Sequence, residues 1–319
     1  MSTSATGPDQ PLWPAYVALH ASGELAARAE RARARLRRCV MCPRNCRVDR
    51  LTGELGVCRT GTPARVASAG PHLGEEAPLV GHGGSGTIFF AGCNLACAFC
   101  QNYDISQPAG DRSEAWEYSA ASLARTMLEL QDIGCENINF VSPSHVVPQI
   151  LEGLVLAAQQ GLRLPLVYNS GGYDALPTLR LLDGVVDIYM PDMKYADEQA
   201  GERLSGVADY VACNRAAVRE MHRQVGVLKM DGRGVACRGL LVRHLVLPGG
   251  FAGTADVMRF ISEELSTATY VNVMGQYRPA HEVSRHPERY PEVCRPPTAA
   301  EYRAAVEAAR EAGLTRLDR

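Results

Sequence analysis

From Thr87 to Gly313 the sequence repeats one pattern, a short apolar run followed by a segment with helical spacing of apolar residues. The apolar runs show no clean polar alternation, which is typical of parallel strands covered on both faces. Strands that alternate with helices favour one parallel sheet with right-handed crossovers. A complete eight-fold barrel would need two more units than the chain supplies. We therefore predict an α/β fold, a six-stranded partial (β/α)6 barrel with a small N-terminal helical and metal-binding extension. The six predicted strands lie in TIFFAGC, NINFVS, LPLVYNS, VVDIYMPD, GLLVRHLVLPG and TYVNVMGQY.

The remaining sequence divides around this repeat. Residues 15–38 are rich in Ala, Glu and Arg and predict an exposed helix, and Asp231-Gly232 predicts a hairpin turn. No apolar run reaches the roughly 20 residues that a membrane span needs. The first 30 residues also lack the layout of a signal peptide, so we expect a cytoplasmic protein without a membrane partner. We predict four regions: a tail and helix over 1–38, with a loose end at 1–13, a four-cysteine metal-binding segment over 39–80, the partial-barrel core over 81–280, and a C-terminal loop and helix over 281–319.

Eleven cysteines in a chain without an export signal indicate a reducing compartment, which favours metal or redox use over disulfides. Seven of the eleven fall in two close groups. The formal net charge of -2 gives no overall field that would favour nucleic acid or a membrane. The scattered cysteines, which we interpret as small buried residues, are Cys135, Cys213, Cys237 and Cys294.

The stretch GCNLACAFCQN carries Cys93, Cys97 and Cys100 directly after the first predicted strand. In parallel α/β folds the chemistry gathers at this end of the strands. A structural zinc site is normally closed by four ligands, whereas a [4Fe-4S] cluster held by three thiolates leaves one iron open for a small molecule. We therefore predict an iron–sulfur site with an open position, and structural zinc is the alternative.

The stretch FFAGCNLACAFCQN closely resembles the cluster loop of radical S-adenosylmethionine (SAM) enzymes, whose fingerprint is C-x3-C-x-aromatic-C, with Phe99 in the aromatic position. The resemblance extends over roughly residues 80–280. Within that superfamily the chain is similar to the activating enzymes of pyruvate formate-lyase, in a subgroup with an N-terminal four-cysteine cluster.

The resemblance implies a cofactor set and partners. Cys93, Cys97 and Cys100 would hold a [4Fe-4S] cluster, and S-adenosyl-L-methionine would chelate its fourth iron. Reductive cleavage to a 5′-deoxyadenosyl radical would make the protein an oxidoreductase. The resemblance further implies an electron donor such as flavodoxin or ferredoxin, and a glycyl-radical enzyme or another macromolecule as substrate.

Residues at the ends of the third and fourth strands extend the resemblance. Met190, Asp192 and Lys194 in YMPDMKY match the family's Met-x-Asp-x-Lys element, which helps to hold a monovalent cation beside the cofactor. Asn169 and Ser170 occupy the corresponding positions of the third strand, although Asn169 stands where the family usually has a carboxylate. The alternative role for Asp192 is a loop or helix cap.

The other strand ends match by position. FVSPSHV replaces the family's Gly-Gly-Glu, which receives the amino group of the cofactor. VRHLVLPGG resembles the Arg-x-x-x-x-Pro-Gly run, so Arg243 or His244 is expected to point at the cofactor carboxylate. A lone histidine such as His145 is often structural rather than catalytic. The remaining positional candidates are Ser142, Ser144 and His145 after the second strand, and Gln276, Tyr277 and Arg278 at the adenine side or the substrate mouth.

A second group of cysteines precedes the repeat, in CVMCPRNCRVDRLTGELGVC. Four thiolates close a metal site completely, so no open position remains there for chemistry. Zinc and a second iron–sulfur cluster fit equally well. The segment either relays electrons or serves as a metal staple for a region too small for its own core. Its four ligands are Cys39, Cys42, Cys46 and Cys58.

Three functions follow from these patterns. The first is a radical SAM enzyme that activates a glycyl-radical enzyme. The second uses the same chemistry to modify a peptide, a nucleic acid or a metabolite, and the replaced Gly-Gly-Glu keeps it open. The third is a zinc-stapled, non-enzymatic binding protein, in which the row of polar strand-end residues would have no purpose.

Overall fold

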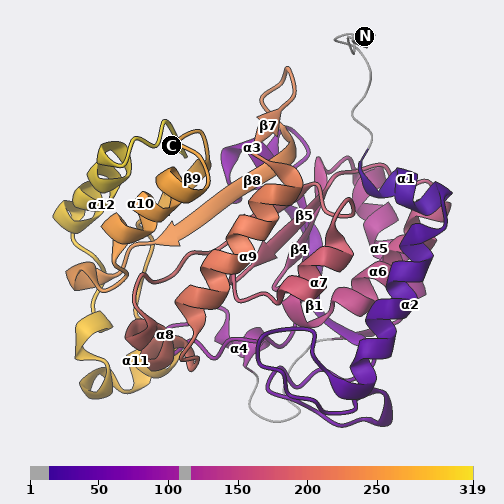
Figure 1. Ribbon diagram of the computed structural model, residues 1–319, viewed down its shortest axis with the longest axis horizontal. Coiled ribbons are helices and arrows are strands. Elements are labelled where there is room, and N and C mark those ends of the chain that lie inside the picture. The colour runs from indigo at the N-terminus through magenta and orange to yellow at the C-terminus, as the bar shows by residue number, and fades with distance from the viewer. Residues whose placement is uncertain (1–13, 108–115, 319) are drawn as a thin grey trace.

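A computed structural model describes residues 14–107 and 116–318, so the loose end predicted for residues 1–13 lies outside the described residues. The fold is α/β, with helices packed around one large mixed sheet (Figure 1). The strands are β1 (Ala64–His72), β2 (Ser85–Phe90), β3 (Trp116–Tyr118), β4 (Asn137–Val141), β5 (Leu166–Ser170), β6 (Ile188–Pro191), β7 (Lys229–Met230), β8 (Ala236–Leu245), β9 (Tyr270–Met274) and β10 (Arg316–Leu317). Their order in the sheet is β10-β9-β8-β6-β5-β4-β2-β1-β3, and β7 pairs with β8.

The six predicted strands are β2, β4, β5, β6, β8 and β9, and they form neighbouring parallel pairs in chain order. The α/β class and this parallel arrangement are therefore confirmed. The predicted count of six strands is wrong, because the sheet has ten strands within the described residues. β3, β7 and β10 are only two or three residues long and carry no apolar pattern. β1 contains Gly70 and Pro71, which disfavour a strand assignment.

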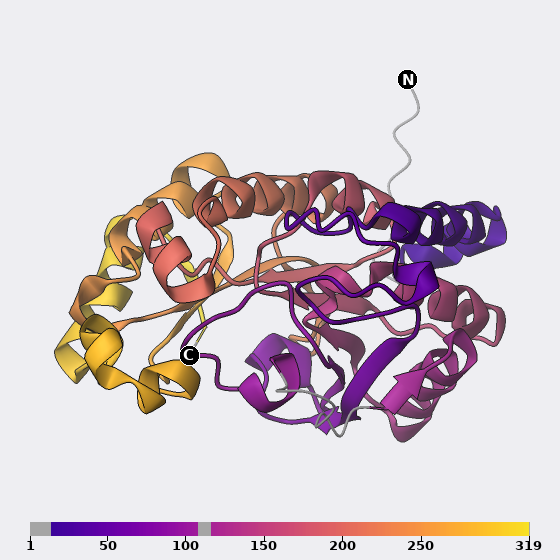
Figure 2. The same cartoon turned by 90° about the horizontal axis from the view of Figure 1, so that it is seen from below.

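Helices cover the sheet and connect its strands (Figure 2). The predicted helix over 15–38 is divided into two helices at Gly23, whose φ of 79° interrupts the helical backbone. The helix α5 (Ala120–Ile133) ends at Gly134, which adopts a left-handed conformation. No helix among the described residues is long and apolar enough to cross a membrane. The helices are α1 (Tyr16–Ala21), α2 (Glu24–Ala34), α3 (Ala77–Val80), α4 (Tyr103–Ser106), α5 (Ala120–Ile133), α6 (Val147–Gln159), α7 (Leu176–Leu179), α8 (Glu198–Ser205), α9 (Tyr210–Val225), α10 (Thr254–Glu264), α11 (His281–Arg285) and α12 (Ala299–Glu311).

The two faces of the sheet have different surroundings. Tyr168 and Tyr189 belong to the large core shared with the surrounding helices. Val167, Ile188 and Met190 alternate with these tyrosines and belong to a smaller buried cluster. We call the face of the sheet that carries this cluster the inner face. Strand register places four polar residues on this same inner face, namely Asn139, Asn169, Asp192 and Arg243.

The predicted hairpin at Asp231-Gly232 is present between β7 and β8. The predicted boundaries of the four regions stay predictions. Within the 39–80 region, β1 pairs with β2 along the sheet, so this part of the N-terminal extension is joined to the core by backbone hydrogen bonds.

Candidate functional site

The loop after β2 carries the three predicted cluster ligands. Gly92 opens it with a φ of 81°, and a Cβ at this position would lie 2.4 Å from the carbonyl oxygen of Cys58. The Leu95 amide donates to Cys93 Sγ at 3.4 Å, and Cys97 Sγ lies 3.1 Å from Ser205 Oγ of α8. Cys100 Sγ lies 3.1 Å from Ser106 Oγ of α4. Only glycine fits the start of this loop, and neighbouring helices provide hydroxyl groups to two of the three thiols.

The electrostatic environment of these thiols suits metal ligands better than free nucleophiles. Burial raises the pKa of Cys93 to about 12. Burial also raises the pKa of Cys97, while the ammonium group of Lys194 opposes this shift. A protonated thiol is a weak nucleophile, but a bound metal ion deprotonates a coordinating thiol.

Phe99, in the aromatic position of the motif, is buried beneath the loop. Its ring makes edge contacts with Tyr195 and Tyr277, at centroid distances of 6.5 and 5.6 Å. Tyr277 donates a hydrogen bond to the Val293 carbonyl and is 2% exposed. Tyr277 therefore packs against the cysteine loop through Phe99. Its neighbours in sequence, Gln276 and Arg278, are exposed.

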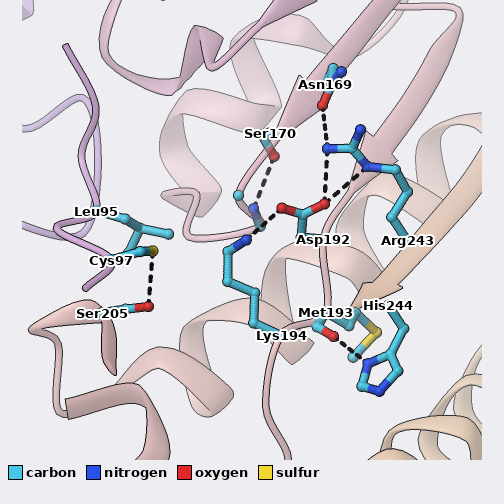
Figure 3. A network of polar contacts seen from close by, with 12 residues as sticks. Leu95, Cys97, Asn169, Ser170, Asp192, Met193, Lys194, Ser205, Arg243 and His244 are labelled. Carbon is cyan, nitrogen blue, oxygen red and sulfur yellow. Dashed lines mark hydrogen bonds and ion pairs between the residues drawn. The ribbon is translucent and has the colours of Figure 1, made fainter. Parts of the chain in front are cut away.

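A charged network lies beside the loop on the inner face, centred on Asp192 (Figure 3). Lys194 Nζ lies 2.6 Å from Asp192 Oδ2, and Arg243 Nη2 lies 2.9 Å from Asp192 Oδ1. Arg243 Nη2 also donates to Asn169 Oδ1 at 2.7 Å. Burial acts to raise the pKa of Asp192, but Arg243 and Lys194 outweigh it and hold that pKa below its usual value. Lys194 and Arg243 bring two positive charges to the single carboxylate of Asp192, so this network suits the carboxylate group of a ligand.

Other predicted residues point away from this network. His244 follows Arg243 on β8 and faces the opposite side, with Nδ1 2.7 Å from the Met193 carbonyl and Nε2 2.9 Å from Thr254 Oγ1 (Figure 3). Burial lowers the pKa of His244 to about 4, so its ring is neutral. Met190 is fully buried in the apolar cluster of the inner face. Ser170 donates to the buried carboxylate of Asp174 at 2.7 Å.

The segment that replaces Gly-Gly-Glu turns toward the N-terminal cysteines. Ser142 has a φ of 59°, and its amide donates to the Asn169 carbonyl at the end of β5. Ser144 bonds to Asp174. His145 Nε2 lies 3.0 Å from the Ala91 carbonyl, and burial lowers the pKa of His145 to about 4. These contacts connect β2, β4 and β5, and they give His145 a structural place.

The four N-terminal cysteines gather around one cavity, together with Arg50 and His145. Arg50 is 1% exposed, donates to the His145 and Gly61 carbonyls, and lies 3.9 Å from Cys39 Sγ. No carboxylate among the described residues pairs with it. A buried guanidinium without a counter-charge is costly, and thiolates around this cavity would supply that charge.

The backbone around these cysteines has an unusual conformation. Asn45, Arg47 and Arg59, which flank Cys46 and Cys58, all have a positive φ. A Cβ on Gly56 would lie 2.8 Å from Cys46 Sγ, so the chain passes close to the sulfur. Left-handed residues outside glycine cost about 1–3 kcal/mol each and persist where the surroundings require them. In the described residues no group of three or more His, Cys, Asp or Glu is arranged to hold a metal ion.

Comparison with known proteins identifies a relative. No protein-family model matches the chain. The chain is 33% identical over 294 residues to the uncharacterized protein MJ0674 of Methanocaldococcus jannaschii. The alignment covers 91% of this chain and 79% of MJ0674. The chain belongs to the MJ0674 family. Because the relative's name assigns no reaction, this membership leaves the activity to be inferred from the site.

The fold of this MJ0674-family protein has a distant likeness to HydG, whose crystal structure is that of a maturase of the [FeFe]-hydrogenase. The TM-score is 0.49 and the identity 11%, over 72% of this chain. The chain spans half the length of that HydG chain, 50% by alignment. A likeness this slight decides neither the fold nor the function.

Two residues of this MJ0674-family site escaped the sequence patterns. Ser205 contacts both the Cys97 thiol and the Tyr195 hydroxyl from α8, more than a hundred residues after the loop. Arg50 is one of many arginines in an arginine-rich stretch, and only its burial sets it apart. No local pattern in the sequence distinguishes either residue.

Proposed function

We propose that this protein is a radical SAM enzyme. Cys93, Cys97 and Cys100 would hold a [4Fe-4S] cluster, which, when loaded and reduced, supplies the electron that cleaves S-adenosyl-L-methionine to a 5′-deoxyadenosyl radical. The observation that carries the proposal is the position of this three-thiol loop at the carboxyl end of β2, beside the positively charged Asp192–Lys194–Arg243 network.

The residues of the chain have defined tasks in this proposal. Arg243 and Lys194 offer the positive charge that would orient the cofactor carboxylate, and Asp192 and Asn169 fix the Arg243 guanidinium. His244 makes its hydrogen bonds on the other side of β8, so between the two candidates we assign the carboxylate to Arg243. A monovalent cation at Asp192 would have to replace Lys194 or Arg243 as its partner.

The finer activity is activation of a glycyl-radical enzyme, with flavodoxin or ferredoxin as electron donor. The Met190, Asp192 and Lys194 element supports this version. The replaced Gly-Gly-Glu supports the second candidate, in which the radical modifies a peptide, a nucleic acid or a metabolite. An electron paramagnetic resonance signal of a glycyl radical on a candidate partner would separate the two.

The deciding experiment measures iron, acid-labile sulfide and zinc in anaerobically purified protein. We expect a triple Cys93/Cys97/Cys100→Ala variant to lose about four irons per chain, as one cluster held by three thiolates requires. A Cys213→Ala variant is the matched control and should keep them, because Cys213 lies in neither cysteine group. Protein that contains only zinc after anaerobic reconstitution would instead support the non-enzymatic, zinc-stapled binding protein.

The metal that remains in the triple variant would identify the N-terminal site. We propose that Cys39, Cys42, Cys46 and Cys58 hold zinc or a second iron–sulfur cluster. The buried Arg50 supports an anionic set of thiolates there. The contact between Gly92 and the Cys58 carbonyl supports a site next to the first cluster, where an electron relay is feasible.

A further inference from the structure

Two acidic residues that the proposed chemistry does not use reach the inner face of the sheet. Glu75 and Glu76 lie between β1 and α3, in the connection that crosses the inner face before β2 begins. Asn272 of β9 donates to Glu76 Oε1 at 2.9 Å, and Asn137 of β4 donates to the Leu79 carbonyl of α3 at 2.8 Å. The connection is thus held at both ends, by strands on opposite sides of the parallel region.

The two carboxyl groups form a buried pair. Glu76 is 6% exposed, and the side chain of Glu75 is 8% exposed. Burial raises the pKa of Glu75 to about 7, and the hydrogen bond and the charge of Glu76 add to this shift, while Arg243 opposes it. Two carboxyl groups in contact share one proton near neutral pH. The pair therefore carries about one negative charge on the inner face.

Two buried acceptor atoms on the inner face, one of them within the acidic pair, have no hydrogen-bond partner in the described part of the chain. They are Glu76 Oε2 and Asn139 Oδ1. Asn139 is fully buried and stands two residues beyond Asn137 on β4, so both side chains face the inner side of the sheet. Buried acceptors without donors are rare because they lose their hydration. Both atoms require a donor, and the nearby Arg243 already donates to Asp192 and Asn169.

Charged side chains of alternating sign form a series on the inner face that begins next to the cysteine loop. Lys194 interacts with Cys97 and with Asp192, and Asp192 pairs with Arg243. Arg243 in turn interacts with Glu75 and Glu76. Glu76 accepts from Asn272 of β9, the neighbour of Arg243 on one side, whereas Asp192 follows β6 on the other side. A molecule anchored at this pair would extend past Arg243 toward the proposed radical site.

We propose that Glu75, Glu76 and Asn139 form a substrate-recognition site for an amino or guanidinium group. This inference rests on the proposed function for its place in the reaction. The carboxylate pair provides the negative charge, and the two unpartnered oxygens provide directed acceptors for N–H donors. A neutral group of the same shape, such as a urea, gains only part of this interaction.

Binding is tested on the anaerobically reconstituted holoenzyme, with n-butylguanidine and its neutral analogue n-butylurea as probes. Saturation-transfer NMR and equilibrium dialysis measure both. We expect the wild type to bind n-butylguanidine about tenfold more tightly than n-butylurea, as a charge-assisted bond implies. We expect Glu76→Gln to remove this preference, and Glu129→Gln, an exposed acid on α5, to keep it. Asn139→Ala is a second variant, useful if Glu76→Gln does not fold, and should weaken n-butylguanidine binding about threefold or more.

Two outcomes would overturn the proposal. One is equal binding of both probes by the wild type. The other is a Glu76→Gln variant that loses S-adenosyl-L-methionine binding but keeps its preference for n-butylguanidine, which would assign the acidic pair to the cofactor. Formation of 5′-deoxyadenosine by the wild type is measured in parallel. Its absence would contradict the proposed function, whereas the probe experiment would still report on the recognition site.

Discussion

The two cysteine groups lie next to each other but are built differently. The loop with Cys93, Cys97 and Cys100 is held by regular elements, with Ser205 of α8 beside one thiol and an aromatic cluster beneath it. The N-terminal group lies in irregular backbone, with left-handed residues on both sides of Cys46. The first borders a charged network on the inner face, and the second surrounds the buried Arg50.

This difference indicates that the charges around each cysteine group, rather than the thiols themselves, determine the role of the group. Three thiolates leave one position of a cluster open, and Lys194 and Arg243 beside them suit the carboxylate group of a small molecule. Four thiolates around one buried guanidinium balance charge within the protein and leave no position for a ligand. The comparison predicts a working site in the loop and a closed site in the N-terminal segment.

The largest effect is expected from removing one loop thiol. Cys97→Ala should reduce 5′-deoxyadenosine formation, with dithionite as reductant, to the level of a protein-free sample, because the cluster would lose one of three ligands. Cys42→Ala should retain most of this cleavage, because dithionite reduces the loop cluster directly. Chromatographic measurement of 5′-deoxyadenosine checks both. Equal loss in the two variants, with the fold intact, would show that the two sites do not have separate roles.

The next effect concerns the buried charge of the N-terminal group. Arg50→Met should destabilise the metal-loaded protein by about 3 kcal/mol, because the thiolates lose their buried counter-charge. In chelator-treated protein no metal holds the thiols as thiolates, and the same change should cost less or stabilise. Thermal unfolding of both forms measures the difference, with the exposed Arg125→Met as control. A greater loss in the metal-free form would exclude an anionic site.

A third effect separates the neighbours Arg243 and His244. Arg243→Gln should weaken S-adenosyl-L-methionine binding about 10- to 100-fold, since a hydrogen bond to a charged group contributes about 1.5–3 kcal/mol. His244→Gln should leave this affinity unchanged and lower the unfolding temperature, because its ring bonds to Met193 and Thr254. Equilibrium dialysis with labelled cofactor decides between them, and the reverse pattern would refute the assignment to Arg243.

The sequence predicted the parts of the fold that local patterns determine. Six long apolar runs became the six parallel strands, because a strand buried on both faces needs such a run. The sequence did not predict β1, because Gly70 and Pro71 are residues that disfavour a strand. The shortest strands carry no apolar pattern. Backbone pairing with neighbours, rather than composition, makes these segments strands.

The candidate site was predictable to a similar depth. Spacing located the three-cysteine loop and the residues at the strand ends, but not the directions of their side chains, as Arg243 and His244 demonstrate. Contacts between distant segments were out of reach. Glu76 bonds to Asn272 across 196 positions, and Arg50 bonds to His145 across 95. Only tertiary packing brings such residues together, so no local sequence pattern predicts these contacts.

The smallest effect extends the comparison to the acidic pair beside Arg243. The folded state raises the pKa of Glu75 to about 7, so it favours the protonated form. The contribution of Glu75 to the stability of the fold is complete at a pH below its unfolded-state pKa. This contribution is lost as the pH rises through 7, the pKa of Glu75 in the folded state. Glu75→Gln cannot ionise and should therefore gain stability relative to wild type between pH 5 and pH 8. The gain is at most about 2 kcal/mol, because the shift belongs to the coupled acidic pair rather than to Glu75 alone.

Unfolding temperatures at pH 5 and pH 8 measure this gain, with Glu129→Gln as an exposed control that should show none. The groups that face Glu75 are His72 on β1, Glu76 beside it and Arg243 on β8. His72 Nδ1 lies 3.5 Å from Glu75 Oε1, so a His72→Gln variant is measured as well. If the gain of Glu75→Gln persists without His72, the acidic pair holds its proton by itself. A gain that is equal at both pH values would mean that Glu75 is already ionised at pH 5, and the pair would then carry two negative charges beside Arg243.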